Sequence, residues 1–366
     1  MKKYLILLMS FCLLCISSVS IPVHAEKPEV VWAHGSVNAV ADDSDSIVDA
    51  QVLQSITEEV NKRLHALDAE KKLPFALKET DSSYEENLSD NAMVALVPLV
   101  MDDQRFETRY VIEGNAFYKS VLMTQIDIAF CYYPGSGNSL RVLHVIPLTG
   151  YALMGEKGEY TAPISKEQYQ QQFIENARQL IQNELYFNNK RFLKDLDYKM
   201  VTPDTYQVTD VTISSPSAQR FYQSRLPIAQ RIIASAYTRQ YAASHEDITI
   251  LPSVFSGKWK EDAAKQTYQL SLGDTGKYLV MEKASHGIHL DLTKVAAFEI
   301  PIKNDAHVYK NIGFTADVKD TTNGKTGTYV KQIKVLDKDN RNRDYHDLDG
   351  IFAQILTEAA KAAAEK

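Results

Sequence analysis

The stretch VKDTTNGKTGTYVKQIKV, residues 318 to 335, decides how the end of this 366-residue chain folds. Asn323 and Gly324 favour a backbone with positive φ, and apolar residues alternate with polar ones on both sides of this pair. The pattern therefore predicts two antiparallel strands, at residues 308–318 and 328–336, that are joined by a tight turn.

The same stretch contains Gly324-Lys325-Thr326, which looks like the end of a phosphate-binding loop. Such a loop needs a glycine five residues before its Gly-Lys pair, but residue 319 is lysine. It also needs a following helix whose N-terminal amides face the phosphate, whereas the residues after Thr326 alternate as a strand does. We therefore expect a hairpin at this position and no bound nucleotide.

Working outward, the chain divides into two halves that repeat one order of elements. Each half has a short strand, a helix, another short strand, two longer alternating strands and a closing amphipathic helix. These segments are residues 30–37, 53–67, 75–79, 118–132, 140–148 and 169–185 in the first half, and 206–213, 228–237, 248–251, 308–318, 328–336 and 348–363 in the second.

This order predicts an α+β fold built from two tandem modules, residues 26–195 and 196–366. Many α+β domains share such an order, so the sequence leaves open whether the halves are a true duplication. In the first module, Ile126 and Phe130 fall on one strand face and Gln125 on the other, which predicts a strand with one buried face.

The first 25 residues have the composition of an export signal. Lys2 and Lys3 are followed by an almost wholly apolar run, and Val23-His24-Ala25 fits a peptidase site. We expect residues 1–25 to be removed after Ala25, with an uncleaved membrane anchor as the alternative, because the apolar run is nearly long enough to span a bilayer.

The predicted location is therefore periplasmic or extracellular, with association with the outer membrane left open. Cys15 lies where a lipoprotein cysteine could, but Leu14 before it is larger than that signal accepts. Cleavage leaves Cys131 as the single cysteine, so the mature chain has no internal disulfide and no cysteine-type zinc cluster. We expect Cys131 to be a small packing residue.

The chain is acidic, with a net charge of −7 that becomes more negative when the two lysines of the leader are lost. Nucleic-acid binding generally needs a basic face that displaces condensed counterions. No stretch interleaves basic and aromatic residues densely enough to provide one, so we expect no nucleic-acid partner.

The closing segments FTADVKDTTNGKTGTYVKQIKV and HDLDGIFAQILTEAAKAAA are similar to the end of a bacterial envelope module. That module occurs in the curli secretion lipoprotein, in the amino-terminal domain of the Tol translocation protein B, and in lipoproteins that activate penicillin-binding proteins. Val318, Asp320, Thr322, Gly324 and the helix from Asp347 match it, and the first half matches in outline.

The resemblance has departures, because the chain lacks the usual lipoprotein cysteine and shows no clear counterpart of a glycine-alanine-aspartate segment found in those families. It implies an envelope protein that docks to a protein or cell-wall partner. It carries over no site residue and no cofactor.

The densest metal-like group is His286, His289 and Asp291, in the run SHGIHLDL. On a strand, His289 and Asp291 share a face while His286 points the other way, so only two ligands converge. Zinc usually takes at least three protein ligands, which favours exposed polar residues over a metal site.

Tyrosines are frequent, and several of them surround the first predicted hairpin. Such side chains combine an apolar ring with a polar tip, which suits a recognition surface, although tyrosine also populates strands well. The candidate recognition residues are Tyr132, Tyr133, Tyr151 and Tyr160.

The preferred function is that of an exported, non-enzymatic envelope protein that docks to a protein or cell-wall component. One alternative is a secreted metal-binding protein or hydrolase that uses His286, His289 and Asp291. A second alternative is a soluble protein that binds a ligand in a cleft between the modules. The oligomeric state is left open.

Overall fold

A computed structural model describes residues 27–40, 46–80, 92–112, 114–188, 204–222, 226–245, 247–272, 276–300, 309–336 and 348–365. The predicted signal, including Ala25, lies outside these residues. The described part combines two sheets with helices, so the α+β class predicted from the sequence is confirmed. None of its helices is both long and apolar enough to cross a membrane.

The first sheet contains all the described strands of the first half and three strands from the second half. Its order is β10-β11-β12-β7-β6-β4-β1-β3, with β2 beside β4 and β5 beside β6. Its strands are β1 (Glu29–Trp32), β2 (Val37–Asn38), β3 (Ala76–Glu79), β4 (Met93–Asp102), β5 (Arg105–Ile112), β6 (Asn115–Tyr133), β7 (Ser139–Met154), β10 (Lys260–Asp262), β11 (Thr267–Ser271) and β12 (Tyr278–Glu282).

The second sheet has the order β15-β14-β13-β8-β9. Its strands are β8 (Thr205–Thr212), β9 (Thr249–Ile250), β13 (His286–Ile300), β14 (Tyr309–Asp320) and β15 (Thr326–Leu336). The described helices are α2 (Ala50–Ala69), α3 (Lys166–Glu184), α5 (Pro216–Tyr222), α6 (Leu226–Ser244) and α7 (Leu348–Ala364).

The order β7-β6-β4-β1-β3 of the first sheet is repeated by β15-β14-β13-β8-β9 of the second. The strand directions agree as well. The pairs β4–β6 and β6–β7 of the first sheet are antiparallel, as are the pairs β13–β14 and β14–β15 of the second. The first strand of each half is parallel to both of its neighbours, β1 to β3 and β4, and β8 to β9 and β13. The predicted order of elements thus has the same pairing in both halves.

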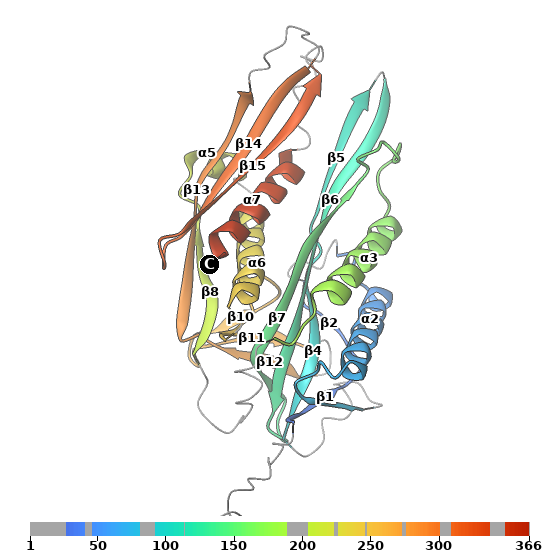
Figure 1. Cartoon of the computed structure of the whole chain (residues 1–366), viewed down its shortest axis with the longest axis vertical. Helices are drawn as coiled ribbons and strands as arrows, with labels where there is room; N and C mark the ends of the chain where they lie inside the picture. The colour runs from blue at the N-terminus through green and yellow to red at the C-terminus, as the bar shows by residue number, and fades with distance from the viewer. Residues whose placement is uncertain are drawn as a thin grey trace, which may run out of the picture.

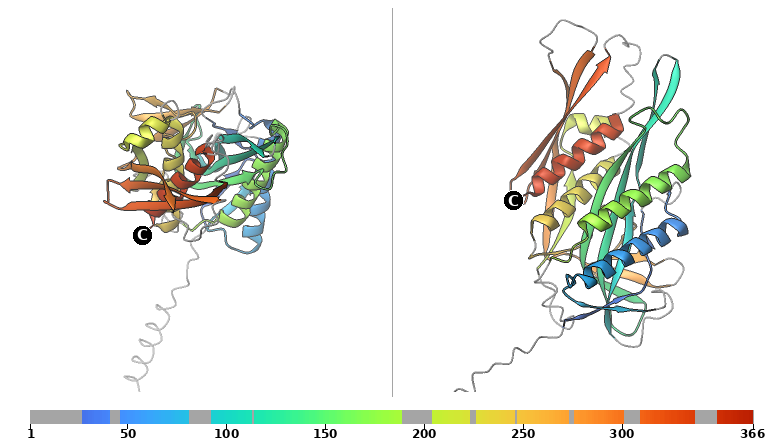
Figure 2. Two further views of the ribbon diagram at one scale, coloured as in Figure 1. Left: turned by 90° about the horizontal axis from the view of Figure 1, so that it is seen from above. Right: turned by 45° about the vertical axis from the view of Figure 1, so that its right-hand side comes forward.

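The elements stack as four layers, which Figure 1 shows from right to left as α2 and α3, the first sheet, α6 and α7, and the second sheet. Figure 2 shows the same separation from other directions, with α2 and α3 together on the outside of the first sheet. As a consequence, the first sheet has helices on both faces, whereas the second sheet has α6 and α7 on one face.

The middle layer explains why one strand prediction is wrong. Ile126 and Phe130 of β6 pack against the outer helices, as their spacing predicts. The opposite face was expected to be exposed, yet Gln125 and Asp127 are 2% and 1% exposed. The second half covers them, and this long-range packing leaves no local periodic signal.

The insertion from β10 to β12 departs from the predicted division of the chain. Residues 260 to 282 belong by position to the second module, but β12 pairs in parallel with the start of β7. The apolar side chains of Leu270, Leu279 and Met281 pack with those of the first sheet. A strand group this small cannot bury enough apolar surface alone, so it extends the larger sheet.

Residues 318 to 335 form the predicted hairpin, because Lys319 of β14 pairs with Thr326 of β15. Gly324 has a φ of +81°, and the buried Asp320 carboxylate accepts hydrogen bonds from the amides of Thr322 and Asn323. This carboxylate also accepts a hydrogen bond from the hydroxyl of Tyr237 on α6, which ties the turn to the middle layer.

Gly327 is where the hairpin meets the closing helix α7. A Cβ atom at this position would lie 2.2 Å from the carbonyl oxygen of Ala359 and 2.2 Å from the amide nitrogen of Ala363. No side chain can occupy that space, so the glycine lets strand and helix backbones touch. The Gly-Lys-Thr-Gly run therefore forms the turn of the hairpin at Gly324 and the close contact with α7 at Gly327.

Candidate functional site

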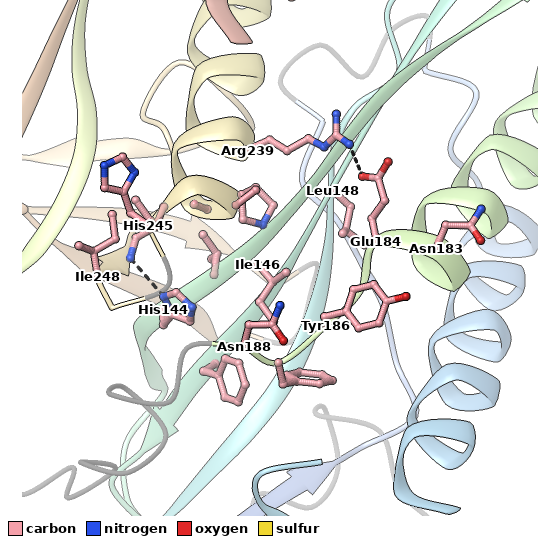
Figure 3. A pocket seen from close by; sticks show the side chains of 17 residues that line it. His144, Ile146, Leu148, Asn183, Glu184, Tyr186, Asn188, Arg239, His245 and Ile248 are labelled. Atoms are coloured by element: carbon pink, nitrogen blue, oxygen red, sulfur yellow. Dashed lines mark hydrogen bonds and ion pairs between the residues drawn. The ribbon is translucent and has the colours of Figure 1, made fainter. Parts of the chain in front are cut away.

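A cleft of about 330 Å³ lies where the two halves of the chain meet. It is formed by β7, by the ends of α3 and α6, and by the segments that follow these helices (Figure 3). We call this site the cleft; its lining residues are Phe130, His144, Val145, Ile146, Pro147, Leu148, Asn183, Glu184, Tyr186, Phe187, Asn188, Arg239, Ala242, Ala243, His245, Ile248 and Ile250.

One wall of the cleft is held by aromatic packing. The ring of Phe187 lies edge-on to Phe75 and to Phe130, with ring centroids 5.1 and 6.0 Å apart. Arg63 of α2 donates hydrogen bonds to the carbonyl oxygen of Leu185 and stacks on the ring of Tyr186. The segment after α3 is therefore fixed in place beside the first sheet.

An ion pair crosses the cleft between the two halves. Arg239 Nη2 on α6 lies 2.6 Å from Glu184 Oε2 at the end of α3, as Figure 3 shows. Their side chains are 23% and 33% exposed, so solvent screens much of this attraction. The pair joins residues 55 positions apart in the chain and places one charge of each sign at the cleft.

His144 of β7 is buried at the cleft and is neutral at pH 7. Its Nδ1 accepts a hydrogen bond of 3.1 Å from the amide of Ile250, so the ring proton resides on Nε2. Burial lowers the pKa of this imidazole to about 4, because the charged form loses its hydration. The ring therefore acts as an anchor between β7 and β9.

His245 lies at the other side of the cleft, after the end of α6. Its ring stacks on Tyr241 with the centroids 4.1 Å apart, and its Nδ1 lies 3.0 Å from the carbonyl oxygen of Tyr241. Tyr241 in turn packs near Tyr206, which stacks on His286. A row of rings therefore connects the cleft to the start of β13.

Two buried carboxylates lie on the inner face of the first sheet, outside the cleft. Burial raises the pKa of Asp127 to about 7, and its carboxylate accepts a hydrogen bond of 3.1 Å from Gln125. Burial also raises the pKa of Asp102 to about 6, although Arg231 of α6 lies 3.2 Å away. The Asp102–Arg231 pair links the sheet to α6.

The three candidate metal residues contact separate partners. His286 stacks on Tyr206 at the start of β13, and Asp291 accepts hydrogen bonds from the amide and hydroxyl of Ser214. The third, His289, has its Nδ1 3.9 Å from Asp210. Among the described residues, no group of three or more His, Cys, Asp or Glu side chains is arranged to hold a metal ion.

The four predicted recognition tyrosines are distributed over three apolar clusters. Tyr133 is buried among the strands beside β12, and Tyr151 packs towards the middle helices. Tyr132 and Tyr160 pack against the cluster beneath α2 and α3. They do not converge on one surface, and none of them lines the cleft.

Cys131 is fully buried on the sheet face opposite Phe130, which confirms the packing role predicted for it. Burial raises the pKa of its thiol, which suppresses the reactive thiolate. It pairs with Val142, whereas His144 pairs with Phe130, so the thiol and imidazole belong to opposite sheet faces.

Sequence reasoning missed the residues of the cleft. Glu184 and Arg239 occupy ordinary positions near the ends of amphipathic helices, and no local spacing relates them. One signal was available in residues 142–148, VLHVIPL, where a strand carries a proline and no Lys, Arg, Asp or Glu. Such a composition is typical of a strand that is buried on both faces, and the proline indicates a position where a backbone hydrogen bond is missing.

Comparisons with known proteins give little further information. No protein-family model matches the chain, and no curated protein matches it. Among solved structures, a Helicobacter pylori protein described as a homologue of a neuraminyllactose-binding hemagglutinin is similar at 9% identity and a TM-score of 0.25. The match covers 49% of this chain and 90% of that one, and a similarity this low carries no argument about function.

Proposed function

We propose that this chain is an exported, non-enzymatic binding protein of the cell envelope, and that the cleft is its binding site. The observation that carries the proposal is the cleft between the two halves, which both halves line. Binding sites are commonly found where two structural units meet, because each unit contributes groups that the ligand brings together.

The size and chemistry of the cleft support a ligand-binding role. Its volume of about 330 Å³ lies at the lower end of the range for small-molecule sites. Apolar walls from β7 and Phe187 bury a ligand, and the charges of Glu184 and Arg239 orient it. This combination of an apolar surface with a few polar groups is typical of binding sites.

The side chains at the cleft support binding more than catalysis. His144 is neutral and is engaged with a backbone amide, and Glu184 is engaged with Arg239. In the described part of the cleft lining, no serine, threonine or cysteine is present to act as a nucleophile beside these groups. The envelope partner in this proposal is a protein segment or a cell-wall fragment.

A thermal-stability screen of the mature chain tests the binding role. A ligand that binds only the folded state stabilises it by about 2.7 kcal/mol at a free concentration 100 times its Kd. This stabilisation raises the melting temperature. Ala243→Trp fills the cleft at an exposed lining position, and Ala264→Trp adds the same ring on an exposed turn outside the cleft lining.

Stabilisation by an envelope extract fraction or a metabolite should be lost in Ala243→Trp and kept in Ala264→Trp. If no tested ligand stabilises the protein, or if both variants respond as the native chain does, the binding role of the cleft is wrong. Export is tested separately by the intact mass of the secreted protein, which should begin at Glu26.

The outer face of the second sheet is a second candidate, for docking of a protein partner. Phe298 of β13 and Val330 of β15 are 43% and 44% exposed on this face. The Phe298 ring lies over Gly313 of β14, where an added Cβ would be 2.5 Å from it. Phe298→Ser combined with Val330→Ser should abolish co-purification of a specific envelope protein if docking occurs here.

A further inference from the structure

The turn between β14 and β15 contains a dipeptide that is chemically unstable in flexible chains. Asn323 is followed by Gly324, whereas every other asparagine of the chain is followed by a residue that has a side chain. In an Asn-Gly pair, the glycine nitrogen reaches the asparagine carboxamide without steric hindrance, because glycine has no Cβ. The least hindered deamidation site of the chain therefore lies in this turn.

Deamidation at such a pair is an intramolecular substitution. The backbone nitrogen of Gly324 loses its proton and attacks the side-chain carbonyl carbon of Asn323, and the carboxamide nitrogen leaves as ammonia. Water then opens the cyclic imide at either carbonyl, which gives aspartate or isoaspartate. The net change consumes water and releases ammonia, so it needs no cofactor and no enzyme.

The folded turn engages both groups that react. The amide of Gly324 donates a hydrogen bond of 2.8 Å to the carbonyl oxygen of Asp320. Loss of the amide proton, with which the attack begins, requires this hydrogen bond to break. The carboxamide oxygen Oδ1 of Asn323 accepts a hydrogen bond of 2.8 Å from the amide of Lys325, which holds the side chain in one position.

Contacts with β13 and α6 hold the turn closed. The amide and the hydroxyl of Thr321 both donate to the carbonyl oxygen of His289, and the hydroxyl of Thr322 accepts from the amide of His289. The Asp320 carboxylate, which caps the turn, accepts a hydrogen bond from the hydroxyl of Tyr237. Opening the turn therefore disrupts contacts with two other elements.

Asn323 and Gly324 are exposed, so water reaches the pair and access does not limit the reaction. Isoaspartate, however, does not fit the closed turn, because it adds a carbon atom to the main chain. The hairpin brings the Asp320 amide to 2.7 Å from the carbonyl oxygen of Lys325, which a longer connection disturbs. Gly327 next to the turn has no room to adjust, since its backbone touches α7.

We propose that Asn323 is a deamidation site that the fold controls. The closed turn blocks the reaction, whereas a chain with an open turn converts to isoaspartate and loses the hairpin. The modification thus marks chains that have unfolded or have not yet folded, and its rate in the native protein reports how often the turn opens. This role is independent of the binding role proposed for the cleft.

The test compares the mature chain in neutral buffer with the same chain unfolded in guanidinium chloride, and peptide mapping quantifies isoaspartate at residue 323. We expect conversion to be at least about tenfold slower in the folded chain, because opening the turn costs the net energy of one or two hydrogen bonds. In the unfolded chain, Asn138 before Ser139 is the internal control and should convert more slowly than Asn323.

Two results of this comparison would overturn the proposal. Equal rates in the folded and unfolded chains would show that the turn does not protect Asn323. Absence of conversion at residue 323 in the unfolded chain would show that it is not a deamidation site.

Variants that loosen the turn test the cause of the protection. Tyr237→Phe removes the donor to Asp320 and should raise the native-state rate about fivefold. Thr321→Val removes a hydroxyl bond to β13 at an exposed position and provides the second test if Tyr237→Phe does not fold. Thr293→Val, whose hydroxyl bonds to Asp317 outside the turn, is the matched control and should not change the rate. Native-state rates that stay unchanged in the folded turn variants would overturn the control by turn opening.

Refolding tests the effect of the product on the hairpin. Asn323→Ser forms no imide and keeps a hydroxyl that can accept from the Lys325 amide. After long incubation in denaturant, this variant should refold fully, whereas the native sequence should lose refolding yield in proportion to its isoaspartate content. Recovery of isoaspartate in the folded fraction at the same proportion as in the unfolded chain would show that the hairpin tolerates it and would contradict the proposal.

Discussion

The first and second sheets have the same strand order, but they lie in different surroundings. In β6 of the first sheet, both faces are buried, and the polar residues Gln125 and Asp127 are enclosed with them. In β14 of the second sheet, Phe314 faces α7, while the carboxylate of Asp317 on the other face is 21% exposed. Strand order alone therefore does not determine how far a side chain is buried. The layers packed against the sheet determine it.

The last strands of the two halves differ in a related way. β15 forms the outer edge of the second sheet and carries Lys331 in its middle. β7 is equivalent in strand order, but β12 adds to its first residues and its residues 144–148 line the cleft. The insertion between β9 and β13 thus makes one of two equivalent strands part of a candidate binding site.

The largest effect that we expect comes from the buried carboxylate of β6. The pKa of Asp127 is raised from 3.8 to about 7, so the native state holds the proton more tightly than the unfolded state does. Its contribution to stability is most favourable below pH 4, declines as the pH rises to about 7, and is constant above that. The shift corresponds to on the order of 4 kcal/mol.

Asp127→Asn removes this titration and should raise the free energy of unfolding at pH 8 by up to about 4 kcal/mol, with little change at pH 4. Urea denaturation at both pH values measures the difference. Asp210→Asn on β8 of the second sheet, whose side chain is 51% exposed, is the control and should change stability by less than about 0.5 kcal/mol. Equal effects of the two substitutions would contradict the difference in surroundings.

The glycines beneath the two closing helices provide the next comparison. A Cβ at Gly327 of β15 would be 2.2 Å from the backbone of α7, whereas one at Gly150 of β7 would be 3.1 Å from the Leu180 side chain of α3. We expect Gly327→Ala to destabilise the protein by about 3 kcal/mol and Gly150→Ala by under 1 kcal/mol. Denaturant midpoints measure both, and a larger loss at Gly150 would show that the close contact is misassigned.

Truncation of large side chains tests the covered face against the open one. Met123 of β6 is 3% exposed under the middle helices, so Met123→Ala should cost about 2 to 3 kcal/mol through a cavity. Phe298 is 43% exposed on the outer face of the second sheet, and Phe298→Ala should cost about 1 kcal/mol. Thermal unfolding measures both variants, and similar losses would mean that the outer face is covered.

The smallest effect is expected at the ion pair between the halves. Arg239→Gln should cost at most about 1 kcal/mol, because both partners are partly exposed and the pair is screened. A double-mutant cycle with Glu184→Gln should give a coupling energy of about 0.5 kcal/mol that falls at high salt. A coupling energy several times larger would mean that this ion pair contributes substantially to holding the two halves together.

Local pattern predicted the strands β6, β7, β14 and β15 and the helices α2, α3, α6 and α7, but it did not predict the 15-residue strand β13 or the 8-residue strand β5. The alternation around β6 and β7, and around β14 and β15, is strong because one face of each strand packs on a closing helix. β4 was missed, since MVALVPLVMD is apolar at nearly every position and contains a proline. Pro98 falls between the residues that pair with β1 and those that pair with β2.

The candidate site was less predictable than the fold. The exclusion of a phosphate loop followed from Lys319 and from the alternation after Thr326, both of which are local. The cleft depends on Glu184 meeting Arg239 and on His144 meeting Ile250, a separation of 106 residues in the second case. No periodicity or motif connects such pairs, because their contact arises only when the two halves pack.

The sequence by itself determined the α+β class, the two long hairpins with their closing helices and the turn at Gly324, because periodicity and backbone preference act over a few residues. Only the tertiary structure decided that β10 to β12 extend the first sheet, that Asp127 is enclosed, and that β7 lines a cleft. These features depend on which surfaces pack against one another, because segments that are far apart in the chain bury each other's side chains.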